Sequence, residues 1–342
     1  MPLLVDQPVI LDTTPLAADV RAQLPEAEFI DLTPPDFTET EVREALGRAH
    51  AVVNPSNLPI TPEMLDLAPH LRIVANVARG FDNLDPDDLA GRGIWATNVP
   101  DAFTVPTAEA TIGLLLMVTR HLNRAAATVR RGDWATVVPG EWDGISLSGK
   151  TIGIVGYGKI GQAVASLARA FGMRVLYTQR HAVAGSPDTY LPLDDLLERS
   201  DVVSLHAPLT PDTRHLLDAT RLARMKPGAV LINTGRGGLI DQDALIAAVE
   251  SGHLRGVGLD VVAAEPFVPE RLRSLPNVVI TPHLAGSTVE SHAEAQRLAM
   301  ENVIAVLRGK RPASALNEPV MTNRLNWPKM DHTDPDHPGV SR

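Results

Sequence analysis

Three polar residues, Arg236, Glu265 and His283, each follow a short apolar run in the last third of the chain. An arginine fork can bind both oxygens of a carboxylate. A histidine can donate a proton to a ketone oxygen, and a nearby glutamate can hold its ring and favour the protonated form. Taken singly, such residues are more often structural. Together they predict acid–base chemistry on a small ketone that carries a carboxylate.

A G-x-G-x-x-G pattern stands between a β-type run and a helical pattern. Gly156 permits a sharp turn, Gly158 lets a phosphate approach the backbone, and Gly161 lets the next helix press against the strand. Lys159 adds positive charge beside the helix N-terminus, and Ile160 completes the loop. This context predicts a dinucleotide site and therefore hydride transfer.

The end of the following strand indicates which dinucleotide is bound. An NAD site usually has an acid about 20 residues past the loop, but here Gln179, Arg180 and His181 stand in that region and residues 177–181 include no acid. Arg180 could bind a 2′-phosphate, which a carboxylate would repel. The sequence therefore predicts NADP(H) over NAD(H). The alternative is that Arg180 lies across the adenine and that both cofactors are used.

The composition narrows the class of protein. A chain of 342 residues is long enough for two domains, and its net charge of −10 argues against nucleic acid or an anionic membrane as a partner. With no cysteine, neither disulfides nor thiolate metal sites can form, and no metal site is expected. The N-terminus lacks a signal-peptide pattern. These features predict a soluble cytoplasmic protein.

The elements that must position these residues alternate between strand and helix. The first hundred residues predict strands at 9–11, 27–32, 51–53 and 71–77, with helices at 39–49 and 62–68. From residue 151 onward the predicted strands are 152–155, 175–177, 202–205, 229–232, 256–260 and 278–281, and the predicted helices are 162–171, 193–199, 221–225 and 241–251. This rhythm indicates an α/β protein with doubly wound parallel sheets.

Three further segments do not belong to this alternation of strands and helices. An apolar helix at residues 107–118 predicts deep burial or a subunit interface. Residues 132–144, with Trp134 and Trp142, look like an arm that contacts a partner. A long helix at 287–308 returns the chain to the first domain, and residues 321–342 are expected to form a surface or disordered tail.

Five ordered motifs, G-Y-G-K-I-G, L-H-A-P-L-T, N-T-G-R-G, G-L-D-V-V-A-A-E-P and T-P-H-L-A-G-S, resemble those of the D-isomer-specific 2-hydroxyacid dehydrogenase family. The resemblance covers residues 50–315. It implies two Rossmann-like or flavodoxin-like domains with the active site in the cleft between them. The substrate domain would comprise residues 1–98 and 286–320, and the NAD(P)-binding Rossmann domain residues 99–285. A homodimer would form through an arm at about residues 107–145.

The resemblance also implies roles for single residues. His283 would be the acid/base, Glu265 its partner and Arg236 the substrate clamp, while the backbone at Ala78, Arg79 and Gly80 would bind the substrate carboxylate. The family's other cofactor-contact positions correspond to Thr107, Ala207, Pro208, Thr213, Thr234, Asp260 and Gly286.

The departures from the family pattern leave alternatives open. Arg79 replaces the middle residue of the usual G-V-G loop, which implies a more cationic pocket and resembles the lysine of phosphite dehydrogenase. Arg79 could also cap a helix or pair with Asp82 or Asp85. The Y-T-Q-R sequence ending at Arg180 resembles NADPH-using glyoxylate and hydroxypyruvate reductases. The expected activity is thus reduction of glyoxylate, hydroxypyruvate or a 2-ketogluconate-type acid; phosphite oxidation and an NAD(P)-sensing, corepressor-like binding protein are the alternatives.

Overall fold

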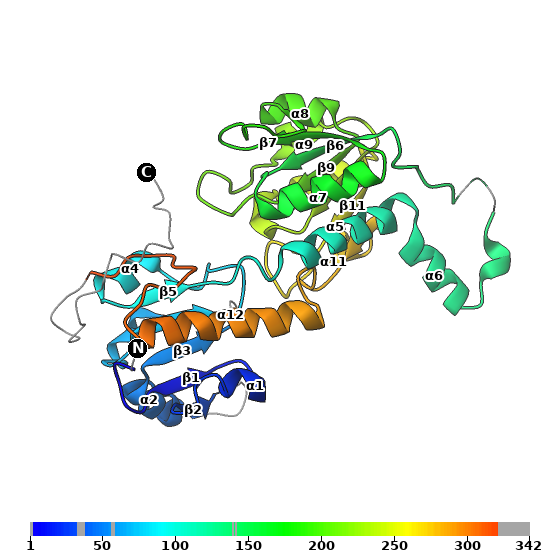
Figure 1. Ribbon diagram of the computed structural model, residues 1–342. Coiled ribbons are helices and arrows are strands. Elements are labelled where there is room, and N and C mark those ends of the chain that lie inside the picture. Colours follow the sequence, from blue (N-terminus) through cyan, green and yellow to red (C-terminus); the bar gives the residue numbers. More distant parts are fainter. Residues whose placement is uncertain (1–2, 33–37, 56–58, 139, 141, 321–342) are drawn as a thin grey trace. The chain divides into compact units, whose positions relative to one another are not determined.

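The computed structural model describes residues 3–32, 38–55, 59–138, 140 and 142–320. The chain divides into two compact units (Figure 1), unit 1 with Met1–Phe103 and Thr288–Arg342, and unit 2 with Thr104–Ser287. These boundaries fall a few residues after those expected near residues 98 and 285. The tail expected at residues 321–342 lies outside the described residues.

The described part of unit 1 contains a five-stranded parallel sheet in the order β2-β1-β3-β4-β5, the flavodoxin-like order. Its strands are β1 (Val9–Asp12), β2 (Glu28–Asp31), β3 (Ala51–Asn54), β4 (Ile73–Asn76) and β5 (Trp95–Thr97). Consecutive residues of a strand face opposite sides of the sheet. Ile10 and Ile73 therefore join one core, while Leu11 and Val74 join the other.

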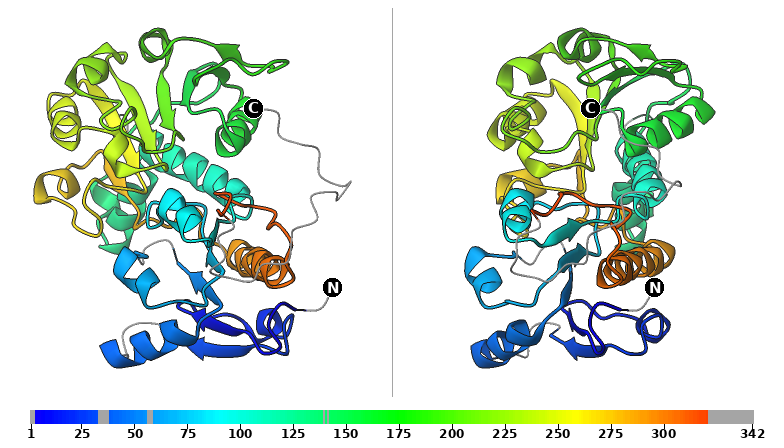
Figure 2. Two further views of the ribbon diagram at one scale, coloured as in Figure 1. Left: turned by 90° about the vertical axis from the view of Figure 1, so that its left-hand side faces the viewer. Right: turned by 60° about the vertical axis from the view of Figure 1, so that its left-hand side comes forward.

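Helices cover both faces of this sheet. α12 (Val289–Leu307) lies along one face with α1 (Ala18–Arg21), and Figures 1 and 2 show it running beside β3 and β4. Thr288 begins α12 with a capping box formed with Ser291. The other face is covered by α2 (Glu39–Arg48), α3 (Pro62–Asp66) and α4 (Pro86–Gly91). The long C-terminal helix thus belongs to the first domain, as expected.

Unit 2 is built on a parallel sheet of seven described strands in the order β12-β11-β10-β9-β6-β7-β8. The strands are β6 (Thr151–Val155), β7 (Arg174–Thr178), β8 (Thr189–Tyr190), β9 (Val202–Leu205), β10 (Ala229–Asn233), β11 (Leu254–Leu259) and β12 (Val278–Ile280). β6 lies between β7 and β9, so the strand order reverses at β6. Such a switch point is where doubly wound sheets bind their ligands.

Helices again lie on both faces. α5 (Thr104–Thr119) and α7 (Lys159–Ala170) pack side by side on one face (Figure 1). The other face carries α8 (Leu193–Arg199), α9 (Ala219–Arg224), α10 (Gln242–Glu250) and α11 (Glu270–Arg273). After α5, α6 (Leu122–Arg130) and the short helix η1 (Trp134–Thr136) extend away from the sheet, and a second short helix, η2 (Gly237–Leu239), follows β10. The predicted fold class, α/β with two doubly wound parallel sheets, is confirmed.

Several element predictions were wrong in detail. α7 begins at Lys159 and not at residue 162, so Gly161 lies inside the helix. The arm expected at residues 132–144 contains η1 and is preceded by α6, and neither helix was predicted from the sequence. Short elements were also missed, namely α1, α4, β5, β8 and α11.

Candidate active site

The glycine loop joins β6 to α7 in a close turn. Gly156 has φ +91°, and a Cβ there would lie 2.6 Å from the Ala207 nitrogen. A Cβ on Gly161 would lie 2.2 Å from the Gly156 carbonyl oxygen, so only glycine allows the helix to approach the turn. At Gly158, the N-cap of α7, an added Cβ would meet no described atom within 4 Å. The backbone there is open to a phosphate at a helix N-terminus, which fits a dinucleotide.

Lys159 and Ile160 form the first turn of α7, but their side chains differ in environment. Ile160 is buried in the core with α5, whereas Lys159 is exposed. If Ile160 contacts a cofactor, it does so through its backbone and not its side chain. Of these two side chains, only that of Lys159 is placed to offer its charge to a bound phosphate.

Ala207 and Pro208 follow β9, and Ala207 lies beside the glycine turn. The Thr213 hydroxyl closes this loop, donating to the Pro208 carbonyl oxygen at 2.7 Å and accepting from the Thr210 N–H at 2.7 Å. The three predicted cofactor positions Ala207, Pro208 and Thr213 thus belong to one internally bonded loop at the switch point.

The residues expected to choose between the two dinucleotides follow β7. Arg180 and His181 are exposed, and the Gln179 amide donates to the His181 carbonyl oxygen at 2.7 Å. The first acid after β7 is Asp188, whose side chain is only 3% exposed and forms an ion pair with Arg169 at 2.5 Å. Its charge is therefore compensated within the protein.

Two tyrosines, which the sequence reading did not single out, hold this segment. Tyr157 stacks on Tyr177 with ring centroids 4.0 Å apart, and the Tyr177 hydroxyl accepts from the Val183 N–H at 2.8 Å. The Tyr157 hydroxyl donates to Asp188. Burial, followed by this hydrogen bond, raises the pKa of Tyr157. The only sequence signal was an aromatic residue between two glycines of the loop.

His283 and Glu265 are in direct contact. The distance from His283 Nδ1 to Glu265 Oε2 is 2.7 Å, and the Val262 N–H donates to Oε1 of Glu265 at 3.2 Å. Both side chains are partly exposed, 51% for His283 and 37% for Glu265. With Nδ1 engaged, Nε2 is the ring nitrogen that can face a substrate.

Asp260 shapes the loop that carries His283. It is 2% exposed, and its Oδ1 accepts from the Thr281 hydroxyl at 2.6 Å and the Leu284 N–H at 2.8 Å, while Oδ2 accepts from the Ala285 N–H at 2.8 Å. His283 itself has a left-handed backbone, φ 55°. These bonds hold His283 in that conformation. The role of Asp260 toward a cofactor, and that of Gly286 just after the loop, remain predictions.

Arg236 stands at the N-cap of η2, where Asn233 fixes the turn. The Asn233 amide donates to the Arg236 carbonyl oxygen at 2.9 Å and accepts from the Gly235 N–H at 3.0 Å. A Cβ on Gly237 would lie 2.0 Å from the Val262 carbonyl oxygen, so this turn abuts the loop that carries Glu265. The Arg236 guanidinium donates to the Gly235 carbonyl oxygen at 2.9 Å.

Thr234 lies in a buried line of hydroxyl groups. Its Oγ1 is 2.9 Å from the Thr111 hydroxyl, which donates to the Thr107 carbonyl oxygen at 2.7 Å. His206 Nδ1 is 3.5 Å from Thr234, and its Nε2 is 2.8 Å from the Ser204 hydroxyl. The predicted positions Thr107 and Thr234 are thus joined through Thr111, a residue that the sequence reading did not single out.

The loop at residues 78–80 belongs to unit 1, where it follows β4. Its Arg79 side chain donates to the Pro100 carbonyl oxygen at 3.2 Å. All other predicted site residues lie in unit 2, where the loops of Arg236, Glu265 and His283 follow the adjacent strands β10, β11 and β12. That the two parts form one site between the domains stays a prediction. The described helices include none long and apolar enough to cross a bilayer.

Known proteins are similar to this chain in sequence. Residues 112–285 match the family model for the NAD-binding domain of D-isomer-specific 2-hydroxyacid dehydrogenases. Glyoxylate reductase of Pyrococcus furiosus is 42% identical over 297 residues, 84% of this chain and 88% of that protein. Its counterpart in Aeropyrum pernix is 37% identical over 92% of this chain and 97% of that protein.

Solved structures agree with the sequence relatives. The NADPH-dependent glyoxylate/hydroxypyruvate reductase of Sinorhizobium meliloti, in complex with NADP and malonate, superposes with a TM-score of 0.81 at 33% identity, covering 91% of this chain and 97% of that one. The dinucleotide turn, the His–Glu contact and these relatives lead to one conclusion: the chain belongs to the D-isomer-specific 2-hydroxyacid dehydrogenase family and is an NAD(P)-dependent oxidoreductase of 2-hydroxy acids.

Proposed function

We propose that this enzyme uses NADPH to reduce a small 2-oxo acid, of the glyoxylate, hydroxypyruvate or 2-ketogluconate type, to the D-2-hydroxy acid. The observation that carries the proposal is the contact between His283 Nδ1 and Glu265 Oε2 on a dinucleotide-binding unit. The bound nicotinamide supplies the hydride. His283 then donates the proton on Nε2 to the ketone oxygen, and Glu265 stabilises the charged ring before transfer.

The substrate carboxylate would be bound by two groups. The guanidinium of Arg236, on the turn beside the Glu265 loop, supplies a planar fork. The backbone of residues 78–80 supplies N–H donors. If these two groups bind the carboxylate, the ketone carbon would remain available to the nicotinamide and the ketone oxygen to His283.

The preference for NADPH is supported by the loop after β7. Arg180 is exposed there, and Asp188, the first acid, is paired with Arg169 and bonded to Tyr157. A 2′-phosphate would therefore meet a cation without an uncompensated carboxylate. The S. meliloti relative, whose structure contains NADP and malonate, supports the same cofactor and a small carboxylate ligand.

Steady-state kinetics with NADPH and NADH, across a panel of 2-oxo acids, test the proposal. We expect a higher kcat/KM with NADPH and turnover of glyoxylate or hydroxypyruvate. Tight NADPH binding without turnover of any acid would instead favour a cofactor sensor. Reduction of the oxidised cofactor on addition of phosphite would favour the phosphite alternative.

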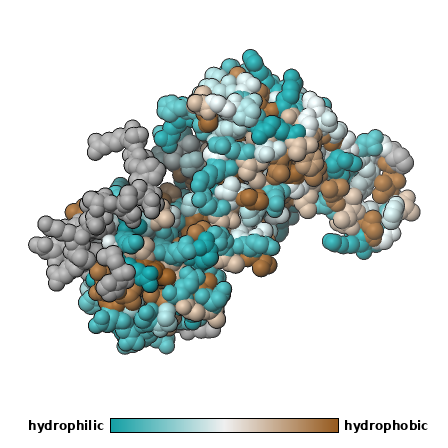
Figure 3. All heavy atoms as spheres, viewed as in Figure 1, coloured by the Kyte–Doolittle hydropathy of each residue, from teal (hydrophilic) through white to brown (hydrophobic). Residues whose placement is uncertain are grey.

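We also propose that the enzyme is a homodimer formed through α5, α6 and η1. Apolar side chains are exposed on this arm, among them Trp134 at 71% and Val129 at 48%, and Figure 3 shows hydrophobic residues over it. Trp142 differs from the expectation, because it is half-buried with the Arg124 guanidinium 4.1 Å from its ring centroid. Trp134, rather than both tryptophans, is the exposed aromatic anchor.

A further inference from the structure

The loop at residues 78–80 is held by its carbonyl groups. The Ala78 carbonyl oxygen accepts from the Val99 N–H at 2.9 Å, the Arg79 carbonyl oxygen from the Asn98 amide at 2.7 Å, and the Gly80 carbonyl oxygen from the Asn76 amide at 3.2 Å. Three consecutive peptide groups are thus fixed by the body of unit 1, two of them by asparagine side chains.

This fixation dictates the direction of the N–H groups. In a planar trans peptide the C=O of one residue and the N–H of the next point in opposite directions. When the three carbonyls are turned toward their donors, the N–H groups of Arg79, Gly80 and Phe81 are turned away from them. Adjacent N–H groups that are turned away from the body of the unit are available to bind an anion together.

The two asparagines are themselves fixed in the protein. Asn76 is fully buried and forms a reciprocal amide pair with Asn83, with N–O distances of 2.7 and 3.3 Å. Asn54, also fully buried, donates to Asn76 at 3.5 Å and accepts from the Thr13 hydroxyl at 2.9 Å. Asn98 is 7% exposed. A chain of side-chain hydrogen bonds across the ends of β1, β3 and β4 therefore leads to the loop.

We propose that Asn76 and Asn98 are positioning residues for the substrate carboxylate, because they orient the two peptide groups whose N–H donors, those of Phe81 and Gly80, bind it. Neither side chain touches the substrate in this proposal. It rests on the proposed function, since it assumes a 2-oxo acid bound at this loop. An apolar residue at either position would leave one of these peptide groups able to rotate, so that its N–H would no longer be held toward the substrate.

The test measures glyoxylate kinetics and NADPH affinity of Asn98→Ala and Asn76→Ala. We expect each variant to raise the KM for glyoxylate about tenfold, the scale of one lost hydrogen bond. The kcat should stay within about twofold, because the loop would bind ground state and transition state alike. The Kd for NADPH, measured by fluorescence, should be unchanged, because the dinucleotide-binding residues lie in unit 2.

Asn317→Ala is the matched control. Asn317 also holds backbone in unit 1, donating to the Pro86 and Ile94 carbonyl oxygens at 3.0 Å and accepting from the Ala96 N–H at 2.9 Å, but it does not bond to residues 78–80. An unchanged KM in the Asn98 variant, or an equal rise in the Asn317 variant, would overturn the positioning role. If Asn76→Ala does not fold, Asn98→Ala alone decides. A wild-type enzyme inactive on every 2-oxo acid would instead overturn the proposed function, and this inference with it.

Discussion

His283 Nδ1 lies 2.7 Å from Glu265 Oε2, and the two residues are 18 positions apart on loops that follow neighbouring strands. The contact fixes which ring nitrogen is available to a substrate. It also holds the imidazole ring in one orientation through a carboxylate oxygen. The arrangement is therefore suited to a histidine that donates its proton from Nε2.

Replacing His283 by asparagine should lower kcat by roughly 10²–10⁴-fold, the usual contribution of a positioned acid. Asparagine tolerates the left-handed backbone at this position, so the loop should be preserved. Steady-state turnover and the Kd for NADPH are the measurements, and the Kd should change little. His215→Asn is the control, because His215 is also exposed and left-handed, with φ 51°. Comparable losses in both variants would indicate a backbone effect and not proton transfer.

Replacing Arg180 by alanine should raise the KM for NADPH far more than the KM for NADH, because only NADPH carries the 2′-phosphate. One lost charge-assisted contact corresponds to about a tenfold or larger effect. Both constants are measured at saturating 2-oxo acid. The exposed Arg199, on α8, gives the control variant Arg199→Ala, which should alter neither constant. An equal effect of Arg180→Ala on both cofactors would show that the phosphate is bound elsewhere.

Most strands of unit 2 could be predicted from the sequence for a physical reason. Buried parallel strands are continuous apolar runs, and β9 and α8 have the predicted bounds. α6 was missed because Leu122 and Val129 are exposed, so its pattern does not mark a buried face. The predicted start of α7, residue 162, lies after its actual start at Lys159, because the glycines there indicated a loop.

The amide chain of unit 1 could not be predicted from sequence. Asn76, Asn83 and Asn98 lie in or beside turns, where asparagine is common for local reasons. Their partners are set by the side-by-side placement of strands far apart in the chain, which brings Asn54 next to Asn76. Asp260 is similar, because only the folded loop shows that its carboxylate bonds to residues 281–285.

Substitutions that introduce negative charge on the arm should dissociate the proposed dimer. Trp134→Asp combined with Val129→Asp places two carboxylates in an apolar contact, which disfavours association. Size-exclusion chromatography with light scattering should show a dimer for the wild type and a monomer for the double variant. Val289→Asp, at an 84% exposed apolar residue outside the arm, should remain dimeric. A monomeric wild type would refute the interface.

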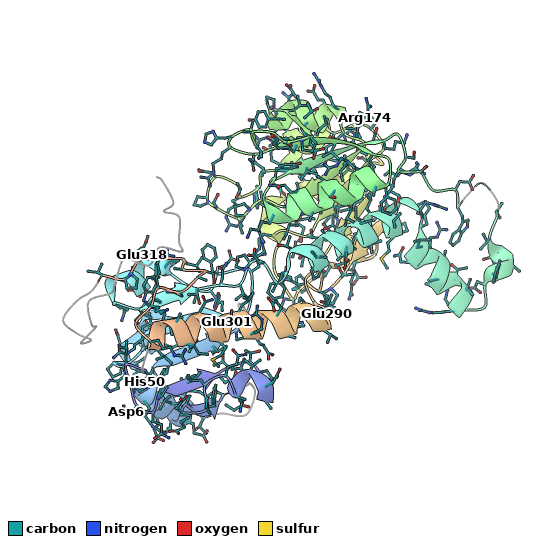
Figure 4. All side chains as sticks on the ribbon, in the orientation of Figure 1. Asp6, His50, Arg174, Glu290, Glu301 and Glu318 are labelled. Atoms are coloured by element: carbon teal, nitrogen blue, oxygen red, sulfur yellow. The ribbon has the colours of Figure 1, made fainter. Side chains whose placement is uncertain are left out.

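His50 should make unit 1 sensitive to acid. In this unit (Figure 4) its Nδ1 accepts from the Val9 N–H at 3.1 Å, and its ring stacks on His70 with centroids 5.9 Å apart. Burial lowers the pKa of His50, and the nearby His70 and Arg72 lower it further. Below its ordinary value of 6.5 the unfolded chain binds a proton that the folded chain does not. The neutral His50 ring therefore contributes its full share to the free energy of unfolding above pH 6.5. That contribution is lost as the pH falls toward the pKa of His50 in the folded state.

The glutamine variant His50→Gln cannot titrate but keeps a hydrogen-bond acceptor, so it should show a smaller fall in Tm than the wild type between pH 7.5 and 5.5, which are about one unit on either side of a free histidine's pKa. Differential scanning calorimetry without ligands gives both values. His181→Gln, at an exposed histidine of unit 2, should retain the wild-type fall. If His50→Gln and the wild type lose the same Tm over this range, protonation of His50 does not oppose folding, and the acid sensitivity of unit 1 arises from other groups.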